Sequence, residues 1–249
     1  LRSCGLLGLG LAAAGASPVA ARAAARLGQG EPLVTRTLPL MGTFVSITAA
    51  HESRDLAEEA VGQAFAEMER LCGVFDRHRG DTAISVLNRD GRLSGAPAEL
   101  SAVVARSLSL SALSGGAFDP SVAPLVDVLR RRSEAGKGLD LSRAELAGLL
   151  ALVDARQVKV DGGRLSLGRS GMALTLDGIA KGFIADRASA GLSSRGVGNH
   201  LVNAGGDIRA CGGKAPGRAW TVAVEDPAKG GDYPAVIELT DGAVATSGN

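Results

Sequence analysis

The stretch LTLDGIAKGFIAD, residues 174–186, decides the fold class of this chain. Its two leucines at alternating positions predict a short strand, and the residues after them predict a helix over 179–191. Short apolar runs return beyond the helix, so we expect strands near 201–202 and 208–210. Strands and helices therefore follow one another without a regular alternation of strand, helix and strand. This order predicts an α+β protein with mixed or antiparallel sheets and packed helices.

The flanking sequence carries the same mixture. Residues 34–48 predict strand, loop and strand, and Asp55 with Glu58 predicts a capping box that opens a helix with apolar side chains at helical spacing. Residues 158–167 predict a β-hairpin, because two alternating runs flank an Asp-Gly-Gly turn. Two more helices are expected to begin near Pro97 and Ser142, and further strands near 221–224, 236–240 and 244–246.

The composition is that of an ordinary globular protein with few aromatic side chains. Of the 249 residues, 45% are hydrophobic and 21% charged, and the formal net charge is +1. A dominant phosphate-binding surface does not fit this balance, so we expect no nucleic-acid partner. The 35 glycines provide tight turns and close backbone approach to a ligand. Three scattered cysteines indicate neither a disulfide framework nor a zinc site.

The first residues are typical of an export signal. An apolar run over residues 6–16 is followed by Pro18 and by Ala21-Arg22-Ala23, and it is shorter than the roughly 20 residues of a bilayer span. We therefore expect an export signal and linker over residues 1–30 and one domain over 31–249, truncated at its C-terminus. An ordinary N-terminal helix is the alternative. The signal predicts a periplasmic protein, with attachment to the inner membrane left open.

Five loop segments combine glycine with polar side chains, and each falls between predicted elements. Glycine lets backbone groups approach a ligand, while carboxylate, hydroxyl and ammonium groups can hold a pyrophosphate and its metal ion. Any one of these segments alone is typical of an ordinary turn, whereas all of them in this order form a specific signal. The segments are Met41-Gly42-Thr43 and residues 114–120, 177–182, 203–207 and 245–248.

In this order the segments resemble the FAD:protein FMN transferase family, the ApbE-like flavin transferases. The resemblance runs from about residue 37 to residue 249 and includes the stretch 75–88. It implies an ApbE-like flavin transferase fold. It also implies an Mg²⁺-dependent enzyme that cleaves the FAD pyrophosphate, attaches FMN through its phosphate to a threonine or serine of a partner protein, and releases AMP. The implied partners are exported or membrane-bound redox subunits.

The resemblance also assigns site residues. Met41 is expected to touch the flavin end of FAD, and Lys181 is expected to face the cofactor. His78 stands where the family commonly has an aromatic residue such as tyrosine, which implies weaker, pH-sensitive stacking. Thr175 stands where the family often has an aspartate, and here the carboxylate comes two places later, at Asp177. The remaining assignments are Ala117, Phe118 and Asp119 at the FAD site, and the Gly178 carbonyl at the metal.

The remaining metal ligands of the family lie in a C-terminal segment that this sequence does not contain, and no catalytic base is assigned. Two other functions stay open: a non-catalytic FAD-binding or carrier protein, and a magnesium-dependent FAD pyrophosphatase that forms free FMN and AMP. Residues 163–170 have the glycine spacing of a P-loop, but Arg169 replaces its lysine. The run of arginines over 130–132 is interpreted as the solvated end of a helix.

Overall fold

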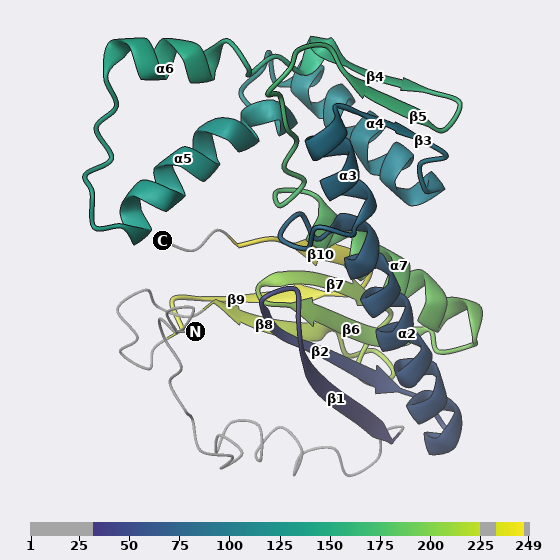
Figure 1. Cartoon of the computed structure of the whole chain (residues 1–249). Helices are drawn as coiled ribbons and strands as arrows, with labels where there is room; N and C mark the ends of the chain where they lie inside the picture. Colours follow the sequence, from purple (N-terminus) through teal and green to yellow (C-terminus); the bar gives the residue numbers. More distant parts are fainter. Residues whose placement is uncertain (1–31, 225–232, 247–249) are drawn as a thin grey trace.

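A five-stranded antiparallel sheet and two long helices form the lower half of the molecule (Figure 1). The structure is a computed structural model that describes residues 32–224 and 233–246. The predicted export signal and linker, 1–30, lie outside the described residues. The strand order is β1 (Leu33–Leu40), β2 (Thr43–Ala50), β6 (Asn199–Ala204), β7 (Asp207–Cys211) and β10 (Gly242–Val244).

The first hairpin turns in two residues. Leu40 pairs with Thr43, which leaves Met41 and Gly42 as the turn. Both residues have positive φ, 55° and 72°, as a type I′ hairpin turn requires. Met41 is the one non-glycine residue with positive φ in the described ranges. The strand, loop and strand predicted over residues 34–48 are confirmed.

Helices α2 (Arg54–Phe75) and α7 (Ala180–Ser194) pack against each other beside this sheet (Figure 1). The buried side of α7 is rich in alanine, which lets the two helices approach closely. The predicted start of α2 needs a correction, because the N-cap is Ser53 and its hydroxyl accepts the Leu56 N–H at 3.3 Å. Asp55 instead lies inside the first turn. The helix predicted over residues 179–191 is confirmed.

The upper half holds four further helices and a small sheet (Figure 1). The hairpin predicted over residues 158–167 is confirmed. A third strand, β3, pairs with β5 and gives a three-stranded antiparallel sheet of order β3-β5-β4. Gly163 lies in the hairpin turn, so residues 163–170 are not a P-loop. The helices are α3 (Ala83–Asp90), α4 (Ala98–Leu113), α5 (Ala123–Glu134) and α6 (Arg143–Leu150); the strands are β3 (Arg92–Ser94), β4 (Val158–Asp161) and β5 (Arg164–Leu167).

Short helices and one separate hairpin complete the fold. The predicted cap of α6 is confirmed as a capping box between Ser142 and Glu145. The arginine run ends α5, as interpreted from the sequence. Helix α3, capped by Thr82, has no counterpart among the predictions.

The remaining elements are the 3-10 turns η1 (Pro120–Val122) and η2 (Ala155–Gln157) and the hairpin of β8 (Trp220–Val224) with β9 (Ala235–Leu239). The α+β class is confirmed.

The strand predicted at Leu174 and Leu176 is wrong, because this segment has no ladder partner. Both leucines are buried, but the backbone of Leu174 is bonded to a side chain. Asn88 accepts its N–H at 2.7 Å and donates to its carbonyl at 2.8 Å. The N–H of Thr175 donates to the carbonyl of Pro120, which does not belong to a strand, at 2.8 Å. The alternating leucines therefore indicated burial on one side and not a sheet.

Within the described ranges, no helix combines the length and the apolar character needed to cross a bilayer.

His200 is a buried histidine of β6 that contacts α7. Its side chain is fully buried, with Nε2 2.7 Å from the Ser189 hydroxyl and Nδ1 2.8 Å from the Val197 carbonyl. Burial lowers the pKa of His200, and the nearby Arg209 charge acts in the same direction, against the Val197 carbonyl and Asp241. The unfolded chain therefore binds this proton more readily than the folded protein does.

We predict that this residue makes the folded protein less stable as the pH falls. A lowered folded-state pKa means that the contribution of neutral His200 is complete above the unfolded pKa of about 6.5 and is lost as pH falls below it. Thermal unfolding of the wild type should therefore show a decrease in Tm between pH 7.5 and 5 that is smaller in His200→Gln. Equal pH dependence in both proteins would contradict the assignment.

Candidate functional site

Three of the five glycine loops meet at one end of the five-stranded sheet. An added Cβ at Gly205 would overlap the side chain of Thr43, and one at Gly206 would overlap the hydroxyl of Thr246. Thr246 also donates to the Gly206 carbonyl at 3.3 Å. Both glycines have positive φ, 70° and 103°. Glycine is therefore required here for close contact between loops as well as for the turn.

The other two loops meet on the opposite side of the site. An added Cβ at Gly178 would lie 3.4 Å from ring carbon Cε2 of Phe118, so these two predicted residues are neighbours. A hydrogen bond holds the backbone of Phe118, because its N–H donates to the Ser114 hydroxyl at 3.0 Å. Gly178 follows the buried segment of Leu174 and Leu176 and directly precedes the first turn of α7.

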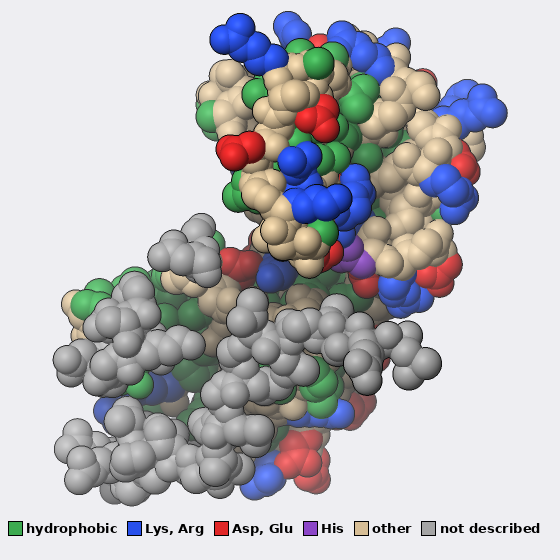
Figure 2. Space-filling model, turned by 60° about the vertical axis from the view of Figure 1, so that its left-hand side comes forward, with side chains coloured by type: hydrophobic (Ala, Val, Ile, Leu, Met, Phe, Trp, Pro, Cys, Tyr) green, Lys and Arg blue, Asp and Glu red, His purple; other side chains and the backbone are tan. Residues whose placement is uncertain are grey.

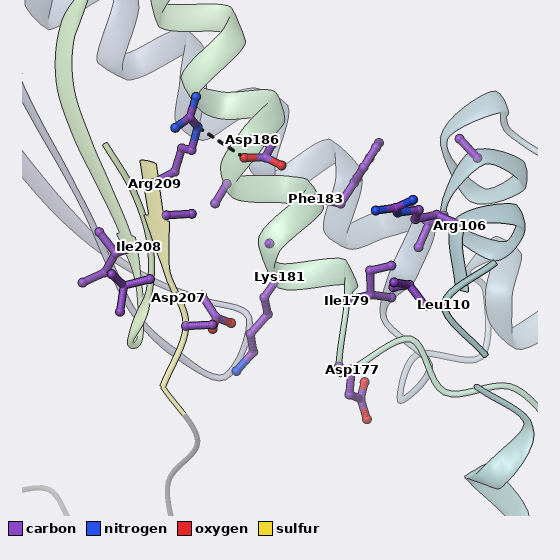
Figure 3. A pocket seen from close by; sticks show the side chains of 18 residues that line it. Arg106, Leu110, Asp177, Ile179, Lys181, Phe183, Asp186, Asp207, Ile208 and Arg209 are labelled. Atoms are coloured by element: carbon purple, nitrogen blue, oxygen red, sulfur yellow. Dashed lines mark ion pairs between the residues drawn. The ribbon is translucent and has the colours of Figure 1, made fainter. Parts of the chain in front are cut away.

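A pocket of about 670 Å³ lies between these two groups of loops. Its walls come from α4, from the loop before α7, from the first half of α7, and from β7 and β10. Figure 3 shows Lys181 extending from the start of α7 beside Asp207 of β7, with Asp177 at the loop before the helix. Figure 2 shows a waist between the upper and lower halves, with Lys and Arg side chains gathered above it.

The pocket combines an apolar wall with charges of both signs. Leu110, Ile179 and Phe183 supply apolar surface. Arg209 is tied to Asp186 by an ion pair of 3.5 Å, drawn as a dashed line in Figure 3. The other charged side chains of the lining are Arg106, Lys181, Asp177 and Asp207. An amphipathic molecule with a ring system and an anionic group fits such a lining.

Helix α7 begins inside this pocket without a side-chain cap. Its N-cap is Ile179, which makes no side-chain cap hydrogen bond. The N–H of Ala180 is bonded to the Leu176 carbonyl at 2.7 Å, so the N–H groups of this first turn that favour an anion are those after it, together with the positive end of the helix dipole. Lys181 adds a positive charge in the same turn. The start of α7 is thus the part of the pocket best suited to a phosphate group.

The sequence-predicted site residues divide into three groups. Lys181 and Gly178 line the pocket, and Phe118 lies against Gly178. Thr175 lies just before the pocket, where its hydroxyl accepts the Asp177 N–H at 3.3 Å. Met41, His78, Ala117 and Asp119 lie outside the pocket lining.

This last group differs in its surroundings. The exposed His78 is placed by its backbone, which donates to the Asp76 carboxylate at 2.9 Å. The carboxylate of Asp119 accepts three hydrogen bonds, from the N–H and hydroxyl of Ser121 and from the N–H of Ala155 at 3.1 Å. It therefore caps η1 and joins it to η2. A direct FAD contact by each of these residues stays a prediction.

Asp177, the carboxylate two places after Thr175, lines the pocket and is paired with an arginine. Its carboxylate accepts from Nε of Arg77 at 3.1 Å, while Nη1 of the same guanidinium donates to Asp127 at 2.8 Å. The side chain of Arg77 is only 7% exposed. Burial opposes its charge most strongly, but the two carboxylates outweigh that cost and raise the pKa of Arg77.

Sequence reasoning missed Arg77, Arg106 and Phe183. Arg77 pairs with Asp177, 100 positions away along the chain, and with Asp127, 50 positions away, and no local pattern reveals such pairing. Phe183 was visible only as an apolar position of a predicted helix. Arg106 lies on the polar side of α4, where a solvated arginine is the ordinary interpretation.

The chain matches a known protein family and individual proteins within it. A family model described as the ApbE family matches residues 41–249. Curated proteins named FAD:protein FMN transferase, from Vibrio cholerae and Treponema pallidum, are 29% and 30% identical over 85% and 84% of the chain. These matches cover 64% and 62% of the relatives, so the chain spans less than two thirds of their length.

Solved structures give the same result. The flavin transferase ApbE of Vibrio cholerae matches with a TM-score of 0.72 and 26% identity, over 88% of this chain and 72% of that one. The apo flavinyl transferase ApbE of Pseudomonas stutzeri matches with a TM-score of 0.75 and 25% identity, over 89% and 71%. The predicted ApbE-like fold is confirmed.

We predict that Gly205→Ala destabilises the protein more than its backbone angle alone requires. A left-handed φ costs an alanine about 1–2 kcal/mol, and the overlap with Thr43 adds to that cost. Gly217→Ala is the matched control, because Gly217 has φ 67° with open space around its Cα. Denaturant unfolding should show the larger loss for Gly205→Ala. Equal losses would mean that the two loops do not touch.

Proposed function

The chain belongs to the ApbE family, and on that premise we propose that it acts as a FAD:protein FMN transferase. The reaction takes FAD and a protein hydroxyl and gives an FMN phosphoester and AMP. The observation that carries the proposal is the start of α7, where Lys181 and uncapped N–H groups face a pocket with an apolar wall. A pyrophosphate between a flavin and an adenosine has that combination of charge and ring surface.

The residues of this chain have two tasks in the reaction. The first turn of α7 and Lys181 bind the pyrophosphate and balance its charge. Phe183, Ile179 and Leu110 supply apolar surface for a ring system and exclude water from that side. The acceptor threonine or serine oxygen then bonds to the FMN phosphorus as the bond from that phosphorus to AMP breaks. The hydroxyl proton passes to a base that we do not assign.

Phosphoryl transfer of this kind needs position and charge balance more than a covalent protein nucleophile. The balanced charges around the pocket agree with that need, since Arg209 is already neutralised by Asp186 while Lys181 faces the pocket. No step requires a protein-bound intermediate.

Magnesium belongs to the proposal only as an expectation. Across the described residues no cluster of three His, Cys, Asp or Glu side chains could hold a metal ion. Gly178 offers one carbonyl, and its neighbour Asp177 is paired with Arg77. Mg²⁺ usually takes at least one carboxylate in an octahedral set of oxygens. The described residues therefore show no preformed cluster of metal ligands, and no step above depends on the metal.

The acceptor and the compartment are also part of the proposal. Exported or membrane-bound redox subunits are the proposed acceptors, and the support is the export-signal pattern of residues 6–23. The same pattern supports a periplasmic location. A non-catalytic FAD carrier would hold FAD in the same pocket without cleaving it. An FAD pyrophosphatase would cleave FAD there and release free FMN and AMP. The products distinguish these three activities.

The test of the reaction uses the full-length protein, including the C-terminal segment that this sequence does not contain, with FAD, Mg²⁺ and an acceptor domain that carries a threonine. We predict that the acceptor gains the mass of FMN less water while AMP appears in equal amount, and that replacing its threonine by alanine abolishes the labelling. Mass spectrometry of the acceptor and chromatography of the nucleotides measure both. Free FMN with AMP would instead indicate a pyrophosphatase, and unchanged bound FAD would indicate a carrier.

A second prediction concerns the affinity for FAD. Lys181→Ala should weaken FAD binding roughly tenfold to a hundredfold, because a charge-assisted contact is worth about 1.5–3 kcal/mol. Lys159→Ala is the matched control, since Lys159 is an exposed lysine of β4 outside the pocket. Titration with FAD followed by fluorescence gives the affinity, and thermal unfolding checks the fold. Wild-type affinity in a folded Lys181→Ala protein would contradict the role of this lysine.

A further inference from the structure

Arg77 joins three separate parts of the upper half of the molecule. It lies in the loop between α2 and α3, and it contacts Asp127 of α5 and Asp177 of the loop before α7. Its guanidinium uses Nε for one carboxylate and Nη1 for the other, at 3.1 and 2.8 Å. A planar fork can hold two carboxylates in fixed directions, which a lysine cannot do.

The two partners of Arg77 differ in how firmly they are held. Asp127 is 24% exposed, is part of a helix and has a second cation, Arg130, at 3.8 Å. Asp177 is 61% exposed and lies outside helix and strand. The buried Arg77 is therefore anchored on the side of α5 and acts on the exposed residue before α7.

The loop tip at Asp177 and Gly178 depends on this contact. The chain before it is fixed by Asn88 at Leu174 and by buried side chains up to Leu176. Both tip residues are exposed. The bond to Arg77 is a side-chain hydrogen bond that ties this tip to the loop between α2 and α3, beside the packing of Phe118 near Gly178.

From this arrangement we propose that Arg77 is a positioning residue of the FAD site. Through Asp177 it holds the loop tip that places Gly178 beside Phe118 and sets the direction in which the first turn of α7, with Lys181, faces the pocket. The role of Arg77 in FAD binding rests on the proposed function. Its hold on the loop at Asp177 exists in the protein without ligand.

The experiment uses the full chain and two kinds of variant. Asp177→Asn removes the charge at an exposed position and should leave the fold intact, while Arg77→Lys keeps the positive charge without the fork. Arg79→Lys is the matched control, because Arg79 lies in the same loop and pairs with the exposed Asp81. Hydrogen exchange of residues 176–182 reports on the loop without ligand, and FAD titration reports on the site.

We expect faster amide exchange at the loop tip and roughly tenfold weaker FAD binding in both Arg77→Lys and Asp177→Asn, with Arg79→Lys like the wild type. Arg77→Lys and Asp177→Asn break the same contact. The double variant should therefore bind FAD no more weakly than the single variant that has the lower affinity. Unchanged exchange in Asp177→Asn would overturn the role of Arg77, and so would additive losses of affinity. Failure of the wild type to bind FAD would overturn the proposed function, while the exchange data still decide whether Arg77 holds the loop.

Discussion

Asn88 gives the backbone of Leu174 both of the hydrogen bonds that a neighbouring strand would otherwise provide. A buried backbone without partners is costly, so the extended segment before α7 can cross the core only because this amide satisfies it. The position of α7 follows from that crossing, and with it the pocket between α7, α4 and the end of the sheet. One side chain of an eight-residue helix thus fixes the backbone of the segment that leads into α7.

The site is made by loops that are distant in the sequence and close in space. At the sheet end, the fit between Gly205 and Thr43 and between Gly206 and Thr246 leaves no room for a side chain. On the other side, Phe118 and Gly178 are in contact and the tip beyond them is tied to Arg77. The pocket therefore lies between two groups of loops, each fixed by contacts of its own. Such a site needs little rearrangement to accept a ligand.

The sequence predicted those features that depend on neighbouring residues. The hairpin over residues 158–167, the capping box at Ser142 and the helix after Ile179 all follow from local patterns, and the structure confirms them. The strand at Leu174 was wrong because alternation reports burial, whereas a strand also needs a partner. The bond from Arg77 to Asp177 crosses one hundred positions and has no local signature. Resemblance to a family identified Lys181 and Gly178, which composition and spacing could not do.

The arm formed by α5 and α6 has a consequence for the motions of the molecule. Helix α5 buries only Ala123 among its residues, and α6 buries none. Short helices with so little buried surface open locally at a free energy well below that of global unfolding. Each opening of α5 displaces Asp127 from Arg77, so local fluctuations of a surface arm reach the guanidinium that holds Asp177. Local opening of the arm therefore removes one of the two carboxylates that hold Arg77 and leaves Asp177 as its remaining ion-pair partner.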